Sequence, residues 1–241
     1  MTPVDTTISL SVVLLAGLIH ASFQLSISVL TLMSGHALGR KTAHHRLMDL
    51  IGGYLLGATV MVVLLLAFIA YLFGALFPGQ IPSIVWVVSC SAAIGVGVSI
   101  WLFYYRSQLG TVLWIPREFA RHLDSRAKST KSSAESFSLG LTSILSEILF
   151  VFAPIVLAAL VLIRLTPDMQ LLGILLYAVV SLLPLYIIGI LISGGHKISH
   201  IQRWRERNKR FLQFAAGSGL LMLGIYVYVE HVVVVSMLGG L

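Results

Sequence analysis

Long apolar runs alternate along this chain with short polar connections. Six runs are each long enough to cross a bilayer as a helix, which needs about 20 residues. They cover residues 7–33, 48–77, 83–105, 136–163, 169–193 and 213–238. None of them shows the period-two alternation that is typical of the strands of a membrane barrel. We therefore predict an all-α polytopic membrane protein with six transmembrane helices.

Composition agrees with this prediction. Hydrophobic residues make up 58% of the chain and charged residues only 10%, with a mean hydropathy of +0.97. A soluble domain has about 25% charged residues, and this chain has too few polar groups to cover a globule in water. The formal net charge is +7, but the charges lie between the apolar runs, so we expect no nucleic-acid partner. The single cysteine, Cys90, excludes an intrachain disulfide.

The basic residues predict an orientation. Fifteen of the sixteen Lys and Arg lie in the connections after the first, third and fifth runs, and the exception is Arg164. The positive-inside rule then places these connections in the cytoplasm and both termini outside, in a prokaryotic inner (plasma) membrane. We expect the connections to meet anionic lipid headgroups, and the cluster at 203–210 would also attract an acidic protein partner. The N-terminus lacks a basic n-region, so we expect no cleaved signal peptide.

The two halves of the chain resemble each other. The spans of the second half, residues 135–241, align with those of the first half, residues 1–108, at an offset of 123 residues, which becomes 122 in the third run. The informative matches are Gly17 with Gly140, Gln24 with Glu147, Tyr54 with Tyr177, Gly95 with Gly217, Gly97 with Gly219, and Tyr104 with Tyr226. With three spans each, the halves would enter the membrane in opposite orientations. We predict a 3+3 inverted repeat, an architecture that recurs in secondary transporters.

Residues 109–134 form a basic cytoplasmic linker between the halves. Within it, the segment Trp114–Arg126 has apolar residues on one helical face and basic residues on the other. This pattern is typical of an amphipathic helix on the membrane surface, although a solvated linker would have the same composition.

One carboxylate lies about midway along the fourth run. A charge at that depth costs about 3 kcal/mol on insertion scales, so Glu147 must face protein, water or a partner. Ser143 precedes it by four residues, and the repeat mates of this pair are His20 and Gln24. Residues four apart share a helix face. We therefore predict a transport or proton site of His20, Gln24, Ser143 and Glu147 at the midplane. The alternative is an interhelical hydrogen bond that only holds the halves together.

Small residues and prolines mark places of close packing or broken helix. Gly17 and Gly140 lead the polar segments of the two halves and would allow close approach or local unwinding. Pro154 and Pro184 can free backbone carbonyls, which is tolerated inside protein or beside a cavity. Gly53 and Gly57 have the GxxxG spacing of a helix-packing surface.

Other chemistry finds no support in the sequence. His36, His44 and His45 lie among Arg and Lys residues that would repel a cation, so we expect a solvated loop and no metal site. HExxH and GxSxG motifs are missing, so we expect no enzyme activity and no cofactor.

The predicted layout resembles the LysE superfamily of exporters. It has six spans in two inverted halves, with both termini outside and a polar first helix in each half that begins near a glycine. The superfamily's branch of CcdA/DsbD transmembrane electron carriers is the most similar in architecture. Those carriers have a Cys-Pro motif in the first helix of each half, where this chain has Ser22-Phe23-Gln24 and Ser146-Glu147. The Pro-Gly-Pro and Asp-rich motifs of other branches are missing too. The resemblance implies an exporter-like fold with its site between the two first helices, and it does not imply electron transfer.

The sequence thus predicts a secondary-type transporter or exporter of a small solute or ion. Its site lies between the first helices of the two halves, and proton coupling through Glu147 and His20 is left open. The alternative is a membrane scaffold, or a subunit of a complex, that transports nothing. The substrate, the coupling ion, the direction and the oligomeric state are not predicted.

Overall fold

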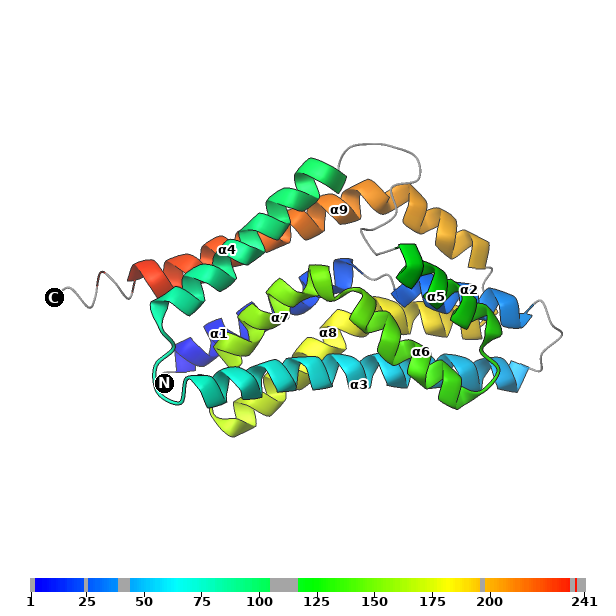
Figure 1. The fold of residues 1–241 in the computed structure, drawn as a ribbon, viewed down its shortest axis with the longest axis horizontal. Helices are drawn as coiled ribbons and strands as arrows, with labels where there is room; N and C mark the ends of the chain where they lie inside the picture. Colours follow the sequence, from blue (N-terminus) through cyan, green and yellow to red (C-terminus); the bar gives the residue numbers. More distant parts are fainter. Residues whose placement is uncertain are drawn as a thin grey trace.

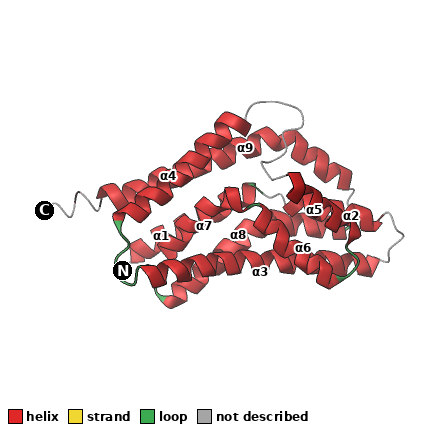
Figure 2. Cartoon of the chain, in the orientation of Figure 1, coloured by secondary structure: helices red, strands yellow, loops and turns green. Residues whose placement is uncertain are grey.

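The computed structural model describes residues 3–23, 26–38, 44–104, 117–195, 198–234 and 237. Within these ranges the chain is helical, with no strand (Figure 2). The α-helices are α1 (Pro3–Ser22), α2 (Ser26–Leu38), α3 (His44–Leu76), α4 (Ser83–Ser99), α5 (Arg117–Ser129), α6 (Ser133–Ser146), α7 (Ile148–Leu162), α8 (Pro167–Ser193) and α9 (Ile198–Tyr228). Two π-helical turns, η1 (Ile100–Tyr104) and η2 (Val229–Val233), extend α4 and α9.

Among the described residues, four helices are long and apolar enough to cross a membrane without interruption. These are His44–Leu76, Ser83–Leu102, Pro167–Ser193 and Arg210–Val233. The first and fourth predicted spans differ from the expectation of single helices. The first is divided into α1 and α2, which are bent by 45°, and the fourth into α6 and α7, which are bent by 79°. The chain is therefore an α-helical membrane protein with four continuous helices of spanning length, or six spans if each bent pair crosses once.

The helices pack in pairs around a central helix. The helix α3 lies along α6, α8 lies along α1, and α4 lies along α9. Figure 1 shows α4 and α9 on one side of the molecule and α3 on the other, with α1 and α7 between them. The half-span α7 contacts α1, α3, α4, α8 and α9. Both halves share one order of elements: a broken helix pair, a long helix, and a helix that ends in a π-turn.

The tightest packing is between α3 and α6. A Cβ at Gly57 would overlap the backbone carbonyl of Phe137, and one at Gly53 would lie 2.6 Å from the carbonyl oxygen of Ser133. On the other helix, a Cβ at Gly140 would overlap the carbonyl oxygen of Tyr54. These three glycines therefore let two helix backbones touch, as the GxxxG spacing predicts.

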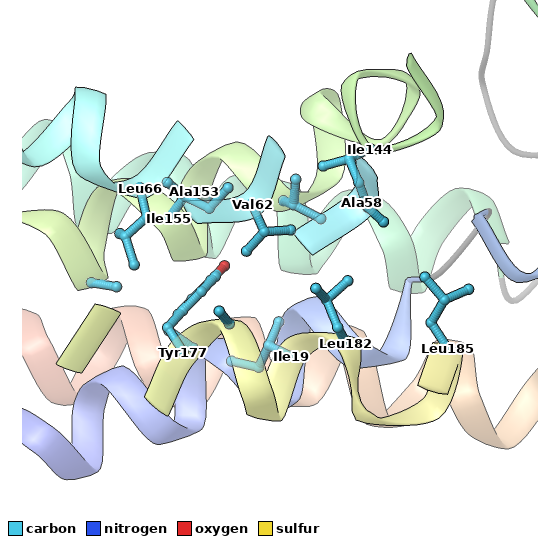
Figure 3. Close-up of a cluster of buried hydrophobic side chains, with 14 of the residues drawn as sticks. Ile19, Ala58, Val62, Leu66, Ile144, Ala153, Ile155, Tyr177, Leu182 and Leu185 are labelled. Atoms are coloured by element: carbon cyan, nitrogen blue, oxygen red, sulfur yellow. The ribbon is translucent and has the colours of Figure 1, made fainter. Parts of the chain in front are cut away.

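The core is apolar and continuous across the two halves. Figure 3 shows Tyr177 rising from α8 between Ile19 and Ile155, toward Val62 of α3. Every residue from Ala153 to Leu162 in α7 is buried. Large apolar side chains such as those on the outer faces of α3 and α8 remain exposed, as a lipid solvent allows.

The linker between the halves contains a helix that packs on the protein. Leu123 and Ala127 of α5 are buried, and α5 contacts α2 and α6. The next helix begins where Ser132 and Glu135 form a capping box, in which each side chain accepts a hydrogen bond from the other's backbone amide. This box fixes the start of α6 at Ser133. Trp114 and Ile115 lie outside the described residues.

Candidate functional site

The break in the fourth span falls at Glu147 itself. This residue follows the last residue of α6 and precedes the first residue of α7. Its amide donates to the carbonyl of Ile144 at 3.0 Å, and its own carbonyl accepts from the amides of Phe150 and Val151 at 2.9 and 3.1 Å. The turn therefore keeps the backbone amide and carbonyl of Glu147 hydrogen-bonded while it redirects the chain by 79°. The residue at this corner is fully buried.

The carboxylate of Glu147 caps the second half of the other broken span. Its Oε1 atom accepts hydrogen bonds from the backbone amide of Ser26 at 2.6 Å and from the Ser26 hydroxyl at 2.7 Å. Ser26 is the first residue of α2, so the negative charge lies at the positive end of the helix dipole. Contacts this short are typical of charge-assisted hydrogen bonds. One carboxylate thus joins the breaks of both spans.

His20 approaches the same carboxylate from the last turn of α1. It is fully buried, and its Nε2 lies 3.8 Å from Glu147 Oε2. Its Nδ1 lies 2.9 Å from the hydroxyl of Tyr177, which is also fully buried. A buried phenol needs an acceptor for its proton. We therefore assign the tautomer in which the Tyr177 hydroxyl donates to Nδ1 and the proton on Nε2 faces Glu147.

A second tyrosine makes the corresponding contact in the other half. The Tyr54 hydroxyl donates to the carbonyl oxygen of Ser26 and lies 2.8 Å from Ser143 Oγ. Ser143 Oγ in turn donates to the carbonyl of Gly140 at 2.8 Å. In the sequence alignment of the halves, Tyr54 corresponds to Tyr177 and Ser143 to His20. The contact between Tyr54 and Ser143 is therefore the counterpart of that between Tyr177 and His20.

Three of the four predicted site residues meet in this network. His20, Ser143 and Glu147 are fully buried and are linked through the two tyrosines and Ser26. The fourth predicted residue, Gln24, lies outside the described residues.

The predicted glycines and prolines do not break their helices. Gly17 lies within α1, where an added Cβ would come 3.2 Å from the side chain of Val180 and 3.4 Å from the carbonyl oxygen of Tyr177. Gly140 lies within α6, against the backbone of α3. Pro154 and Pro184 lie inside α7 and α8, which continue through them. The two glycines therefore provide close approach, and the break in the fourth span comes at the glutamate.

Three members of the network, Ser26, Tyr54 and Tyr177, are not among the four predicted site residues. Tyr54 and Tyr177 were matched in the repeat, but their position beside the polar pair was not foreseen. Their shared register was the signal that could have revealed them. Ser26 is one of several serines in the first run, and nothing local distinguishes it from its neighbours.

The chemistry of the network is that of a single negative charge held by neutral donors. Among the described ranges, no group of three His, Cys, Asp or Glu side chains could hold a metal ion. No protein-family model, curated protein or solved structure matches this chain significantly. The function must therefore be inferred from the geometry of the site.

Proposed function

We propose that this protein is a secondary-type membrane transporter or exporter that moves a small solute or ion by alternating access. The observation that carries the proposal is the meeting of two broken spans at one fully buried carboxylate. Transporter sites are commonly formed by discontinuous helices near the bilayer midplane. A carboxylate at that depth is costly, which is why such residues are functional hypotheses by default.

The contacts on either side of Glu147 support a 3+3 inverted repeat. The pairs His20–Tyr177 and Ser143–Tyr54 occupy matching positions in the aligned halves. Gly17 likewise approaches the Tyr177 carbonyl where Gly140 approaches that of Tyr54. We extend the proposal to the orientation that the basic residues favour, with both termini outside a prokaryotic plasma membrane and basic connections against anionic headgroups. We further propose a LysE-like exporter architecture without redox cysteines, as the sequence resemblance implies.

Proton coupling follows from the movement of the two halves that alternating access requires. Glu147 belongs to the second half and Ser26 to the first, so the hydrogen bonds at 2.6 and 2.7 Å tie one half to the other. Alternating access moves the halves against each other and separates these partners. A carboxylate that leaves its donors inside a membrane must take up a proton or a cation. We propose that Glu147 takes a proton in that state and returns it when the contact with Ser26 re-forms.

The test is proton flux in liposomes that contain the purified protein and an internal pH-sensitive dye. We expect an imposed pH gradient to collapse through the wild type and through Glu230→Gln, which removes a carboxylate from η2, far along the chain from the site. Glu147→Gln should show no flux above that of empty liposomes. Flux that survives in Glu147→Gln, or a wild type that carries none, would contradict the proposal.

The alternative is a membrane scaffold in which the hydrogen bonds between Glu147 and Ser26 only hold the two halves together. The observation in its favour is that the Glu147–Ser26 contact joins residues that are 121 positions apart. If Glu147→Gln lowered the stability and neither protein carried protons, the scaffold interpretation would replace the transporter.

A further inference from the structure

We infer that the N-terminus of α2, together with His20, forms a binding site for a small monovalent anion, and that the Glu147 carboxylate occupies this site when no anion is bound. The inference rests on the proposed function and specifies the class of its solute. The carboxylate is then a tethered competitor of the solute. An anion can enter only when Glu147 has left, and Glu147 can leave only as the neutral acid.

The first observation is the pair of donors at Ser26. Its backbone amide and its hydroxyl both point at one oxygen, Glu147 Oε1. Ser26 is fully buried, and α2 is 13 residues long, so the dipole of a full helix supports the two donors. Helix N-termini with free amides bind carboxylate, phosphate and halide groups in many folds. Here the protein's own carboxylate fills that position.

The second observation is independent and comes from α1. His20 Nε2 is fully buried and makes no hydrogen bond within the described part of the chain. It lies 3.8 Å from Glu147 Oε2, which is beyond hydrogen-bonding distance. A donor in such a position is costly to leave without an acceptor. Glu147 therefore satisfies the two donors of Ser26 but not this third one, and an untethered anion could settle between all three.

The charge of the surroundings limits the solute to one negative charge. Among the described residues, the titratable groups in contact with the site are Glu147 itself, His20 from α1, Tyr54 from α3 and Tyr177 from α8. Lys and Arg are missing from the sequences of α1, α2, α6, α7 and α8. Neutral donors and a helix end, with an equivalent charge of roughly one half, can balance a single anion but not a dianion.

Two anions cannot occupy the site together, because their repulsion would be large where the effective dielectric constant is low. Each anion that enters thus requires one proton on Glu147. An anion therefore binds only together with a proton, whereas Glu147 can take up a proton without an anion, as the proton flux of the proposed function requires. Replacement of the Glu147 carboxylate by the anion needs only the anion itself and a proton from water.

The experiment measures the binding of formate and of bromide to the full chain in lipid nanodiscs by calorimetry. In the wild type, affinity for both probes should rise as the pH falls from about 8 to about 5, because protons release the tethered carboxylate. In Glu147→Ala, both probes should bind at neutral pH at least about tenfold more tightly than in the wild type, with little pH dependence.

The donors are tested within the Glu147→Ala background. Ser26→Pro removes the amide and the hydroxyl together, at the first helical position, where proline is well tolerated. We expect it to weaken binding by roughly a hundredfold, since each hydrogen bond to an anion is worth about a factor of ten. Ser28→Ala, two residues further along α2 and exposed, is the matched control and should change nothing. If Glu147→Ala does not fold, the pH dependence of anion binding to the wild type alone tests the inference.

The outcomes separate this inference from the proposed function. Proton flux in the wild type without binding of either probe at any pH would overturn the anion site and leave the transporter. Binding that depends on Ser26, in a protein that carries no protons, would support the anion site and overturn the transporter. Binding in Glu147→Ala that is indifferent to Ser26→Pro would also overturn the inference.

Discussion

The contact between α3 and α6 is the tightest helix packing in the protein, and a single methyl group should disrupt it. In Gly57→Ala, the new Cβ would overlap the Phe137 carbonyl oxygen and lie 2.9 Å from its carbonyl carbon. Carbon atoms in normal contact are about 3.5–4.0 Å apart, so the helices would have to separate by close to 1 Å. The obstructing atoms are backbone, which means that no change of rotamer can relieve the overlap.

The expected magnitude follows from two opposing effects. Overpacking typically costs about 1–3 kcal/mol, and a rigid backbone contact belongs at the upper end of that range. Alanine regains about 1 kcal/mol over glycine in helix propensity. We expect a net loss of about 2 kcal/mol in the free energy of unfolding. Gly52→Ala, in the same helix, is the control, because its Cβ would have nothing within 4 Å. That variant should gain up to about 1 kcal/mol.

The assay is reversible unfolding by sodium dodecyl sulfate in bicelles, followed by helicity for both variants and the wild type. The two variants should differ by about 3 kcal/mol, which is roughly a hundredfold in the unfolding equilibrium. Equal stabilities for the two variants would refute the reasoning, because position within α3 would then be irrelevant. A Gly57→Ala protein more stable than the wild type would show that α3 and α6 are not in backbone contact.

Two further predictions concern the tyrosines and the orientation. Tyr54→Phe and Tyr177→Phe each remove a hydroxyl from the buried network, and each should lower the free energy of unfolding by about 1–3 kcal/mol in the same assay. A variant with no loss would show that its hydroxyl makes no effective hydrogen bond. For the orientation, Gln80→Cys should react with a membrane-impermeant maleimide in intact cells, and Ser125→Cys only after permeabilisation. The wild type, whose one cysteine Cys90 is buried, is the unlabelled control, and the reverse pattern would invert the orientation.

The continuous spans could be predicted because lipid demands apolar residues over about 20 positions, and few other structures do. The meeting of His20, Ser143 and Glu147 could be anticipated for a related reason. Each half places its polar residues four apart, and the register of the predicted repeat would set the two pairs at similar depths. The spacing of the polar residues and the energetic cost of a buried charge were sufficient to predict that these residues meet.

The helix breaks could not be predicted, because they depend on tertiary contacts between distant parts of the chain. No glycine or proline lies within the corner at Glu147, whereas Pro154 lies inside an unbroken helix. The chain turns where the carboxylate can reach the end of α2, and that contact joins positions 121 residues apart. Local preferences carry no information about such a contact. Tyr54 and Tyr177 differ in this respect, because their matching positions in the two halves could have indicated a shared role.

The burial of α7 from Ala153 to Leu162 has a consequence for how the protein is made. This half-helix is about 22 Å long at 1.5 Å per residue, shorter than the hydrocarbon layer of about 30 Å. It leaves the ribosome before α8 and α9, two of the helices that contact it. During synthesis it must therefore meet lipid on the sides that they later cover. Its sequence, ILFVFAPIVLAALVL, has no polar side chain, so lipid can be exchanged for protein without breaking a hydrogen bond. The α7 residues that α9 covers can therefore be buried only after α9 has been made.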